Sequence, residues 1–176
     1  MKKIILTLAI VALAACGTTQ KFNATKNEQG DLIGIASKED FEKEPYFTEW
    51  FNDYHSGYEA DNATVTAINN HLEGVTIKAF MGTWCGDSQR EVPTFYNIFD
   101  QTDFNYKNLE LVTVDRNKKA KGLEKGYDII KVPTFIFFKN GKELGRFVEH
   151  PVNEASLEHD ILQIISGKNY KHAYQK

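Results

Sequence analysis

Short apolar runs alternate with longer amphipathic stretches along the second half of the chain. The runs at Val75–Met81, 109–115 and 134–138 are rich in β-branched and aromatic residues, which is typical of central strands. Asn140 and Gly141 separate the third run from residues 142–148. This dipeptide favours a tight hairpin because both positions accept a positive φ. The pattern therefore predicts four strands, of which the last two form a β-hairpin.

Apolar residues with helical spacing mark the segments around these strands. Phe47, Trp50, Phe51 and Tyr54 recur at i, i+3, i+4 and i+7 and predict an amphipathic helix whose apolar side packs in the core. A short helix is expected just before it, starting after Ser37, a residue suited to cap a helix. We expect further helices over residues 62–72, 85–99, 116–127 and 153–165.

The first fifteen residues have the pattern of an export signal. Lys2 and Lys3 precede an apolar run over residues 4–15, which is too short to span a bilayer because a spanning helix needs about 20 residues. The run leads through Leu-Ala-Ala into Cys16 and resembles the bacterial lipobox, whose cysteine is acylated. We expect Cys16 to anchor the protein to a membrane of the bacterial envelope. The alternative is ordinary cleavage after Ala14, which leaves Cys16 unmodified in a secreted protein.

Composition narrows the possible functions. The formal net charge is -3 over 176 residues, so no basic excess indicates a nucleic-acid partner. The chain has two cysteines, Cys16 and Cys85. If Cys16 carries lipid, the mature protein has one thiol and no internal disulfide. A lone thiol is prone to oxidation in an oxidising compartment, so the presence of Cys85 calls for a role.

The sequence around Cys85 suits a reactive thiol. It lies where a predicted strand meets the first turn of a predicted helix, and unpaired N–H groups and the helix dipole favour a thiolate there. Gly86 permits a tight turn, Trp84 can shield one side, and Ser88 can donate a hydrogen bond to the sulfur. Asp87 acts in the opposite direction, because a nearby carboxylate disfavours the thiolate. The alternatives are a buried, unreactive Cys85 and a Ser88 that caps the helix.

Several motifs in order resemble the thioredoxin family over about residues 74–167. They are Trp84-Cys85-Gly86, Pro93, Val114-Asp115, Val132-Pro133-Thr134-Phe135 and Phe138-Lys139-Asn140-Gly141-Lys142. The resemblance implies a thioredoxin-like three-layer α/β/α sandwich with a central mixed sheet, here with an N-terminal helical extension. It also implies that Pro133 is cis and faces Cys85, and that the backbone of Val132 pairs with a bound peptide. The predicted substrate-binding residues are Trp84, Gly86, Asp87, Val132 and Pro133.

The predicted domain layout follows from these patterns. We expect a signal peptide over residues 1–15, a polar tether over 16–36, a helical extension over 37–73, the thioredoxin-like domain over 74–170 and a tail over 171–176.

The departures from the family pattern bear on the mechanism. Ser88 stands where the family has its resolving cysteine, Asp87 replaces a proline, and Ala79 replaces the buried aspartate that assists proton transfer. Without a second thiol, a mixed disulfide at Cys85 is released only by an outside thiol. Cys85 and Ser88 are accordingly the predicted catalytic residues.

These observations support three hypotheses. The first is an envelope protein that exchanges disulfides through Cys85, acts on protein or small thiol and disulfide substrates, and depends on an external thiol reductant. The second is a redox-inactive thioredoxin-fold module that binds peptides. The third compares Cys85, Gly86, Asp87 and Ser88 with the Cys-Gly-Phe-Ser motif of single-thiol glutaredoxins that hold iron-sulfur clusters, and Trp84 and the exported leader argue against it.

No metal site or cofactor is predicted. The five histidines, His55, His71, His150, His159 and His172, show no ligand-like grouping with one another or with Cys85. The lysine run at Lys118, Lys119 and Lys121 is interpreted as a solvated helix face.

Overall fold

The computed structural model describes residues 23–152 and 155–175. The predicted signal peptide, Cys16 and the first part of the predicted tether therefore lie outside the described residues.

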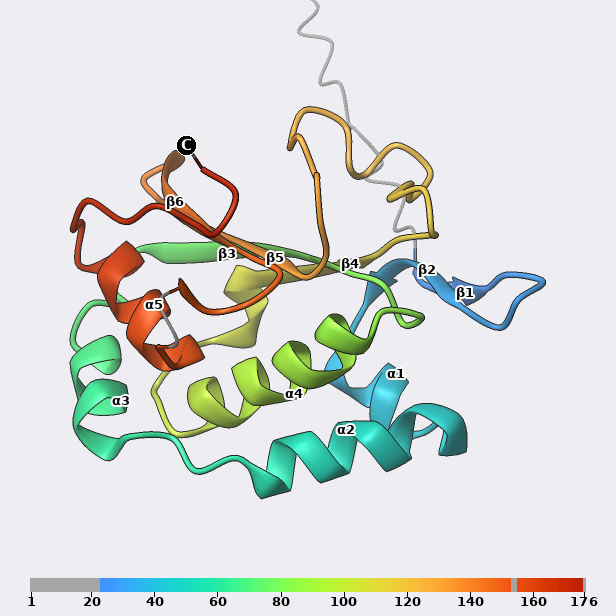
Figure 1. Ribbon diagram of the computed structural model, residues 1–176, viewed down its shortest axis with the longest axis horizontal. Coiled ribbons are helices and arrows are strands. Elements are labelled where there is room, and N and C mark those ends of the chain that lie inside the picture. The colour runs from blue at the N-terminus through green and yellow to red at the C-terminus, as the bar shows by residue number, and fades with distance from the viewer. Residues whose placement is uncertain (1–22, 153–154, 176) are drawn as a thin grey trace, which may run out of the picture.

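Within the described residues, a six-stranded mixed sheet forms the centre of the molecule (Figure 1). Its order is β1-β2-β4-β3-β5-β6, in which β3 and β4 are parallel and the other neighbours are antiparallel. The strands are β1 (Thr25–Lys26), β2 (Leu32–Ala36), β3 (Val75–Met81), β4 (Leu109–Thr113), β5 (Thr134–Lys139) and β6 (Lys142–Val148). The four predicted strands are confirmed. Asn140 and Gly141 have φ values of 52° and 74°, as the predicted hairpin requires.

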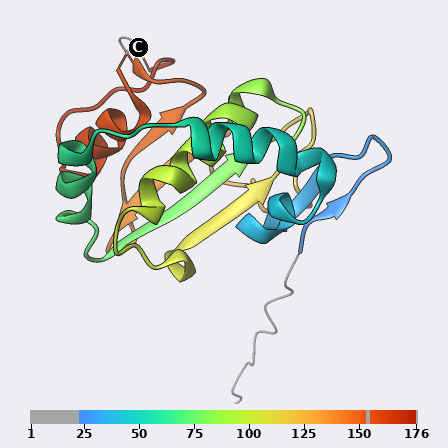
Figure 2. The ribbon, with the colours of Figure 1, turned by 90° about the horizontal axis from the view of Figure 1, so that it is seen from below.

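The helices gather on one face of this sheet, and Figure 2 shows them in front of the strands. Phe51 of α2 and Phe95 of α4 are buried in the core between these helices and the sheet. The large buried aromatic side chains make this the main core of the molecule. The helices are α1 (Lys38–Glu42), α2 (Pro45–Gly57), α3 (Asn62–Asn69), α4 (Gly86–Asp100), the 3-10 helix η1 (Tyr106–Asn108) and α5 (Leu157–Ile165).

A loop covers the opposite face of the sheet. Leu123 and Tyr127 from this loop pack against a smaller core that contains Phe80, Val112 and Ile136. The predicted sandwich with a central mixed sheet and an N-terminal helical extension is confirmed, and this loop supplies its third layer.

The helix predicted over residues 116–127 is wrong. This segment forms successive turns, because Lys118 and Lys121 adopt φ values of 60° and 55°, and Gly122 and Gly126 adopt 98° and 83°. An α-helix needs negative φ throughout, so four left-handed residues prevent it from forming.

The tether predicted over residues 16–36 is wrong for its second half. Residues 25–36 form the β1-β2 hairpin, and β2 pairs antiparallel with β4 from Gly34↔Thr113 to Ala36↔Leu111. Leu32 is buried in the main core. The hairpin thereby covers an edge of β4 whose backbone groups would otherwise lack partners in the sheet.

The last helix begins later than predicted. The hydroxyl of Ser156 accepts a hydrogen bond from the backbone N–H of His159 at 3.4 Å and caps α5, which starts at Leu157. Residues 153–154 lie outside the described residues.

Candidate active site

Cys85 lies between the end of β3 and the start of α4. It is the N-cap residue of this 15-residue helix and has an extended backbone. Its N–H donates to the carbonyl of Gly82 at 3.0 Å, which closes the turn, and its carbonyl accepts from the N–H of Gln89 at 2.9 Å. The side chain is partly exposed. The thiol thus sits at the positive end of a long helix and is accessible to solvent.

A second segment, distant in sequence, meets the thiol. The Sγ atom of Cys85 donates a hydrogen bond to the carbonyl of Val132 at 3.3 Å. The Val132-Pro133 peptide bond is cis, as predicted. The carbonyl of Pro133 accepts from the N–H of Glu149 at 2.8 Å, which joins this loop to the end of β6. Three predicted site residues, Cys85, Val132 and Pro133, therefore lie together.

Trp84 forms one wall beside the thiol. Its indole Nε1 donates to the carbonyl of Val114 at 2.9 Å, and the Arg116 guanidinium lies 5.4 Å from the ring centroid. The ring also lies against Gly82, where an added Cβ would be 2.5 Å from Cε2 of the indole. These contacts fix the orientation of the ring.

Ser88 makes a different contact from the one predicted. It is fully buried, and its Oγ accepts a hydrogen bond from the backbone N–H of Gly82 at 3.2 Å. Among the described contacts, no hydrogen bond joins it to the sulfur of Cys85, so that prediction is corrected. The capping alternative is corrected as well, because Gly82 precedes α4 and Cys85 is the N-cap residue. The tight turn aims the hydroxyl back at β3.

The carboxylate of Asp87 forms an ion pair. Its Oδ1 accepts from Nη2 of Arg90 at 2.8 Å, and Nε of Arg90 donates to Oε1 of Glu91 at 2.8 Å. Glu91 is only 4% exposed, and this burial raises the pKa of its carboxyl. Arg90 thus offsets part of the negative charge that Asp87 brings near the thiol.

Sequence reasoning missed Arg90 and Glu91, although both left a signal. Asp87 and Arg90 are three residues apart, the spacing at which opposite charges meet on a helix. Glu91 precedes Phe95 and Phe99 by four and eight residues, so it is a carboxylate on the buried stripe of α4.

Ala79 lies in an apolar part of the sheet. It is 1% exposed and is paired with Leu111 of β4 and Phe135 of β5. The ring of Phe135 lies 4.8 Å from that of Phe95. The side chain at position 79 therefore offers no group that can carry a proton.

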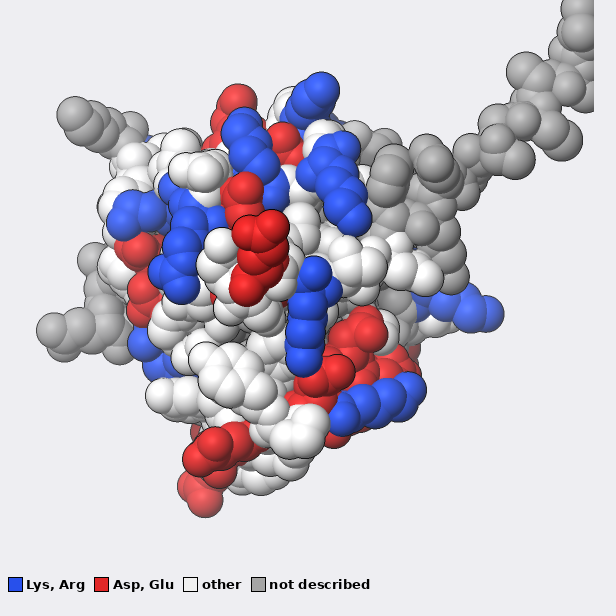
Figure 3. Space-filling view, turned by 90° about the vertical axis from the view of Figure 1, so that its right-hand side faces the viewer, with Lys and Arg blue, Asp and Glu red and all other residues white. Residues whose placement is uncertain are grey.

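Basic and acidic side chains are interspersed on the side of the molecule shown in Figure 3, so the charge on this side is not of one sign. Across residues 23–152 and 155–175, no three His, Cys, Asp or Glu side chains come close enough to share a metal ion. None of the helices in this described part of the chain is long and apolar enough to cross a membrane.

Comparisons with known proteins identify similar chains. Residues 59–163 match the family model described as Thioredoxin. A thioredoxin-like protein of Acanthamoeba polyphaga mimivirus is 29% identical over 99 residues, which cover 56% of this chain and 68% of the relative. A thioredoxin of Ictalurus punctatus is 32% identical over 100 residues, covering 57% of this chain and 89% of the relative.

A solved structure has a fold similar to that of this chain. A protein of unknown function from Pseudomonas aeruginosa aligns with a TM-score of 0.57 and 17% identity, over 76% of this chain and 93% of that one. At this identity the likeness bears on the fold alone.

Proposed function

The chain belongs to the thioredoxin family, and we propose that it exchanges disulfides through the single thiol of Cys85. The observation that carries this proposal is that Cys85 and Ser88, three residues apart at the start of α4, differ in their exposure to solvent and in their contacts. Cys85 is partly exposed at the N-cap of α4 beside the carbonyl of Val132, whereas Ser88 is fully buried and bonded to Gly82. One reactive group therefore faces solvent, and no second thiol lies next to it among residues 23–152 and 155–175.

The proposed reaction has two exchange steps. In the first, the Cys85 thiolate attacks one sulfur of a substrate disulfide, a new S–S bond forms, and the other substrate sulfur leaves as a thiolate that takes a proton from solvent. In the second, a thiolate of an external thiol or of the substrate attacks the substrate sulfur of the mixed disulfide, a new S–S bond forms to that sulfur, and Cys85 leaves as a thiolate. The chain itself is neither oxidised nor reduced over the cycle, so net reduction requires the external thiol.

The residues around the sulfur position the substrate in this proposal. Trp84 forms a fixed wall, because Val114 holds its indole in place. In the free protein the Val132 carbonyl accepts a hydrogen bond from the thiol, and a bound peptide competes for this acceptor with its own N–H. Protein or low-molecular-weight disulfides are the proposed substrates.

The proposed location is the bacterial cell envelope, with the protein anchored by lipid on Cys16. The support for this part comes from the sequence of residues 1–16 alone.

A peptide-binding module without redox activity is the second candidate. The apolar surroundings of Ala79 favour it, because no carboxylate is present there to assist proton transfer. Both candidates use the surface around Trp84 and Pro133, and they differ in whether Cys85 reacts.

The reactivity of Cys85 can be measured directly. A peptide whose cysteine is activated as a 2-pyridyl disulfide is mixed with the folded protein, and adduct formation is followed by mass spectrometry. An unstructured peptide with the sequence of residues 82–88 serves as the reference thiol. We expect the folded protein to react about tenfold faster than the reference, and Cys85→Ser to form no adduct. A folded wild type that reacts no faster than the reference would favour the binding module.

A further inference from the structure

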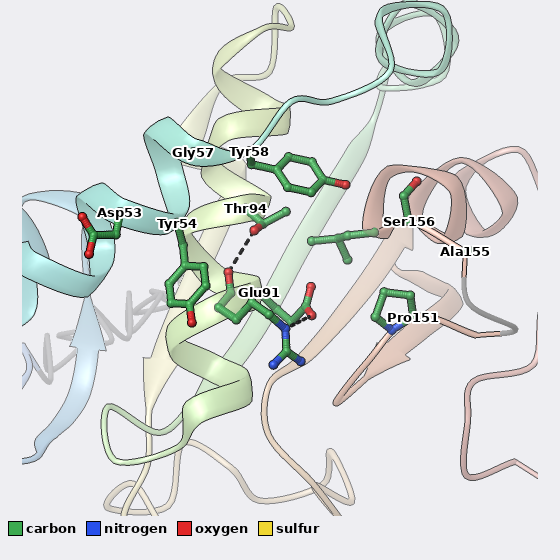
Figure 4. A pocket seen from close by; sticks show the side chains of 11 residues that line it. Asp53, Tyr54, Gly57, Tyr58, Glu91, Thr94, Pro151, Ala155 and Ser156 are labelled. Atoms are coloured by element: carbon green, nitrogen blue, oxygen red, sulfur yellow. Dashed lines mark hydrogen bonds and ion pairs between the residues drawn. The ribbon is translucent and has the colours of Figure 1, made fainter.

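A pocket of about 430 Å³ lies between the last turn of α2, the second turn of α4, Pro151 and the residues at the start of α5, Ala155 to Leu157 (Figure 4). Tyr54 and Tyr58 line it from α2 and its end, Arg90 and Glu91 line it from α4, and Pro151 closes the opposite side. Neither Cys85 nor its neighbours in the turn line this pocket.

Two walls of the pocket are continuous with the active site. Arg90 is bonded to Asp87, which follows Cys85 by two residues. Pro151 follows Glu149 by two residues, and the N–H of Glu149 is bonded to the carbonyl of Pro133. A polypeptide that is bound at the thiol can therefore place in the pocket a side chain that lies near its own cysteine.

The pocket holds one buried carboxylate, that of Glu91. Asp53 also lines the pocket, but Figure 4 shows its carboxylate pointing away from Glu91 on the far side of Tyr54. Arg90 is the one cationic side chain of the lining among the described residues. The guanidinium of Arg90 already donates to Asp87 and Glu91, so its charge is compensated.

Glu91 also has capacity to bind a further donor. Its Oε1 accepts from Arg90, and no described residue donates a hydrogen bond to its Oε2. Figure 4 shows its carboxylate on the side of the helix that faces Pro151. Glu91 is only 4% exposed, so its carboxylate has lost most of its contact with water, which is unfavourable for a charged group. A cation that enters the pocket would offset this cost by pairing with the carboxylate.

We propose that the pocket receives a lysine or arginine side chain of the substrate polypeptide, close to the disulfide that Cys85 attacks. The charged end pairs with Oε2 of Glu91, the rings of Tyr54 and Tyr58 offer faces for a cation, and the aliphatic stem lies along Pro151. An acidic side chain is rejected, because it would approach the carboxylate of Glu91, and the guanidinium of Arg90 is already paired. This proposal rests on the proposed exchange function and adds a preference among its substrates.

The test uses a series of short peptides that each carry one cysteine, activated as a 2-pyridyl disulfide, in a background of Gly, Ala and Ser. One arginine is placed in turn at each other position, and a parallel series carries glutamate. The rate of adduct formation at Cys85 is measured for wild type and Glu91→Gln. Glu49→Gln is the matched control, because Glu49 lies on α2, is exposed and does not line the pocket.

We expect at least one arginine position to react roughly fivefold or more faster than its glutamate counterpart in wild type and in Glu49→Gln. Glu91→Gln should reduce this ratio strongly. The comparison of the two peptide series in wild type tests the proposal even if Glu91→Gln does not fold. Equal rates at every position, or faster reaction of the glutamate series, would overturn the proposal while leaving the exchange function standing. Failure of all peptides to react would instead count against the exchange function itself.

Discussion

The Oγ atom of Ser88 accepts a hydrogen bond from the backbone N–H of Gly82 at 3.2 Å, and this contact ties the first turn of α4 to the end of β3. Both residues are buried, so Ser88→Ala leaves a backbone donor without an acceptor or water. We expect this variant to lower the free energy of unfolding by about 1–3 kcal/mol in urea titrations. Ser56→Ala, on an exposed position of α2, is the control and should change stability little. Equal stability of the two variants would show that the contact contributes nothing.

Gly82 and Gly86 flank the reactive cysteine and should respond differently to alanine. A Cβ at Gly82 would lie 2.5 Å from the indole of Trp84, whereas a Cβ at Gly86 meets nothing within 4 Å. We expect Gly82→Ala to displace Trp84, change its fluorescence and destabilise the protein by about 1–3 kcal/mol. Gly86→Ala should leave the fluorescence and the thermal unfolding nearly unchanged. Similar behaviour of both variants would contradict the packing of Trp84 on Gly82.

Asp100 joins the N-terminal extension to α4. Its carboxylate accepts hydrogen bonds from Lys38 at 2.6 Å, from His55 at 2.8 Å and from Tyr106 at 2.7 Å. Burial alone would raise the pKa of Asp100, but these hydrogen bonds outweigh it and hold the pKa below its usual value. The folded state therefore binds this proton less readily than the unfolded chain does, and the resulting stability is present above the unfolded value of about 3.9 and lost as the pH falls below it.

Asp100→Asn should accordingly lower the free energy of unfolding by about 1–2 kcal/mol at neutral pH. The difference from wild type should shrink as the pH is lowered below about 3.9. Urea unfolding at a series of pH values measures this gap, with Glu49→Gln as a control acid on the exposed side of α2. A gap that is constant with pH would show that the carboxylate charge is not involved.

The sequence was informative where local periodicity and tertiary packing agree. Strands β3 and β6 coincide with the predicted ranges, because buried apolar runs and an Asn-Gly turn leave little choice of register. The lysine-rich segment was misjudged because composition does not reveal the positive φ of Lys118 and Lys121. Strand β2 was missed because its five residues follow a polar stretch and gain their partner only from β4.

In the active site, too, the local sequence predicted some features, whereas others depend on tertiary packing. The motif around Cys85 located the thiol and the wall formed by Trp84, and the resemblance to the thioredoxin family implied the cis Pro133. The acceptor role of Ser88 toward Gly82 depends on how tightly the chain turns after β3, which spacing alone does not give. The pocket beside Glu91 depends on how α2, Pro151 and the start of α5 are placed around α4, so no local pattern encodes it.

The lipid anchor is a separate prediction that rests on Leu13-Ala14-Ala15-Cys16. Cells are labelled with radioactive palmitate, and membrane and soluble fractions are compared. Wild type and Cys85→Ala should both carry label in the membrane fraction, whereas Cys16→Ala should carry none and lose its membrane association. Label on Cys16→Ala, or an unlabelled wild type, would disprove the anchor.

The central claim is that Cys85 exchanges disulfides without a resolving thiol, and the release of a bound peptide tests it most directly. The mixed disulfide between Cys85 and a peptide is prepared, freed of excess thiol and followed over time for wild type and Ser88→Cys. We expect the wild-type adduct to persist until glutathione is added and then to decay at a rate proportional to its concentration. Ser88→Cys should release the peptide without added thiol, because an adjacent thiol acts at a high effective concentration. Release of the peptide from wild type in the absence of any added thiol would contradict the claim.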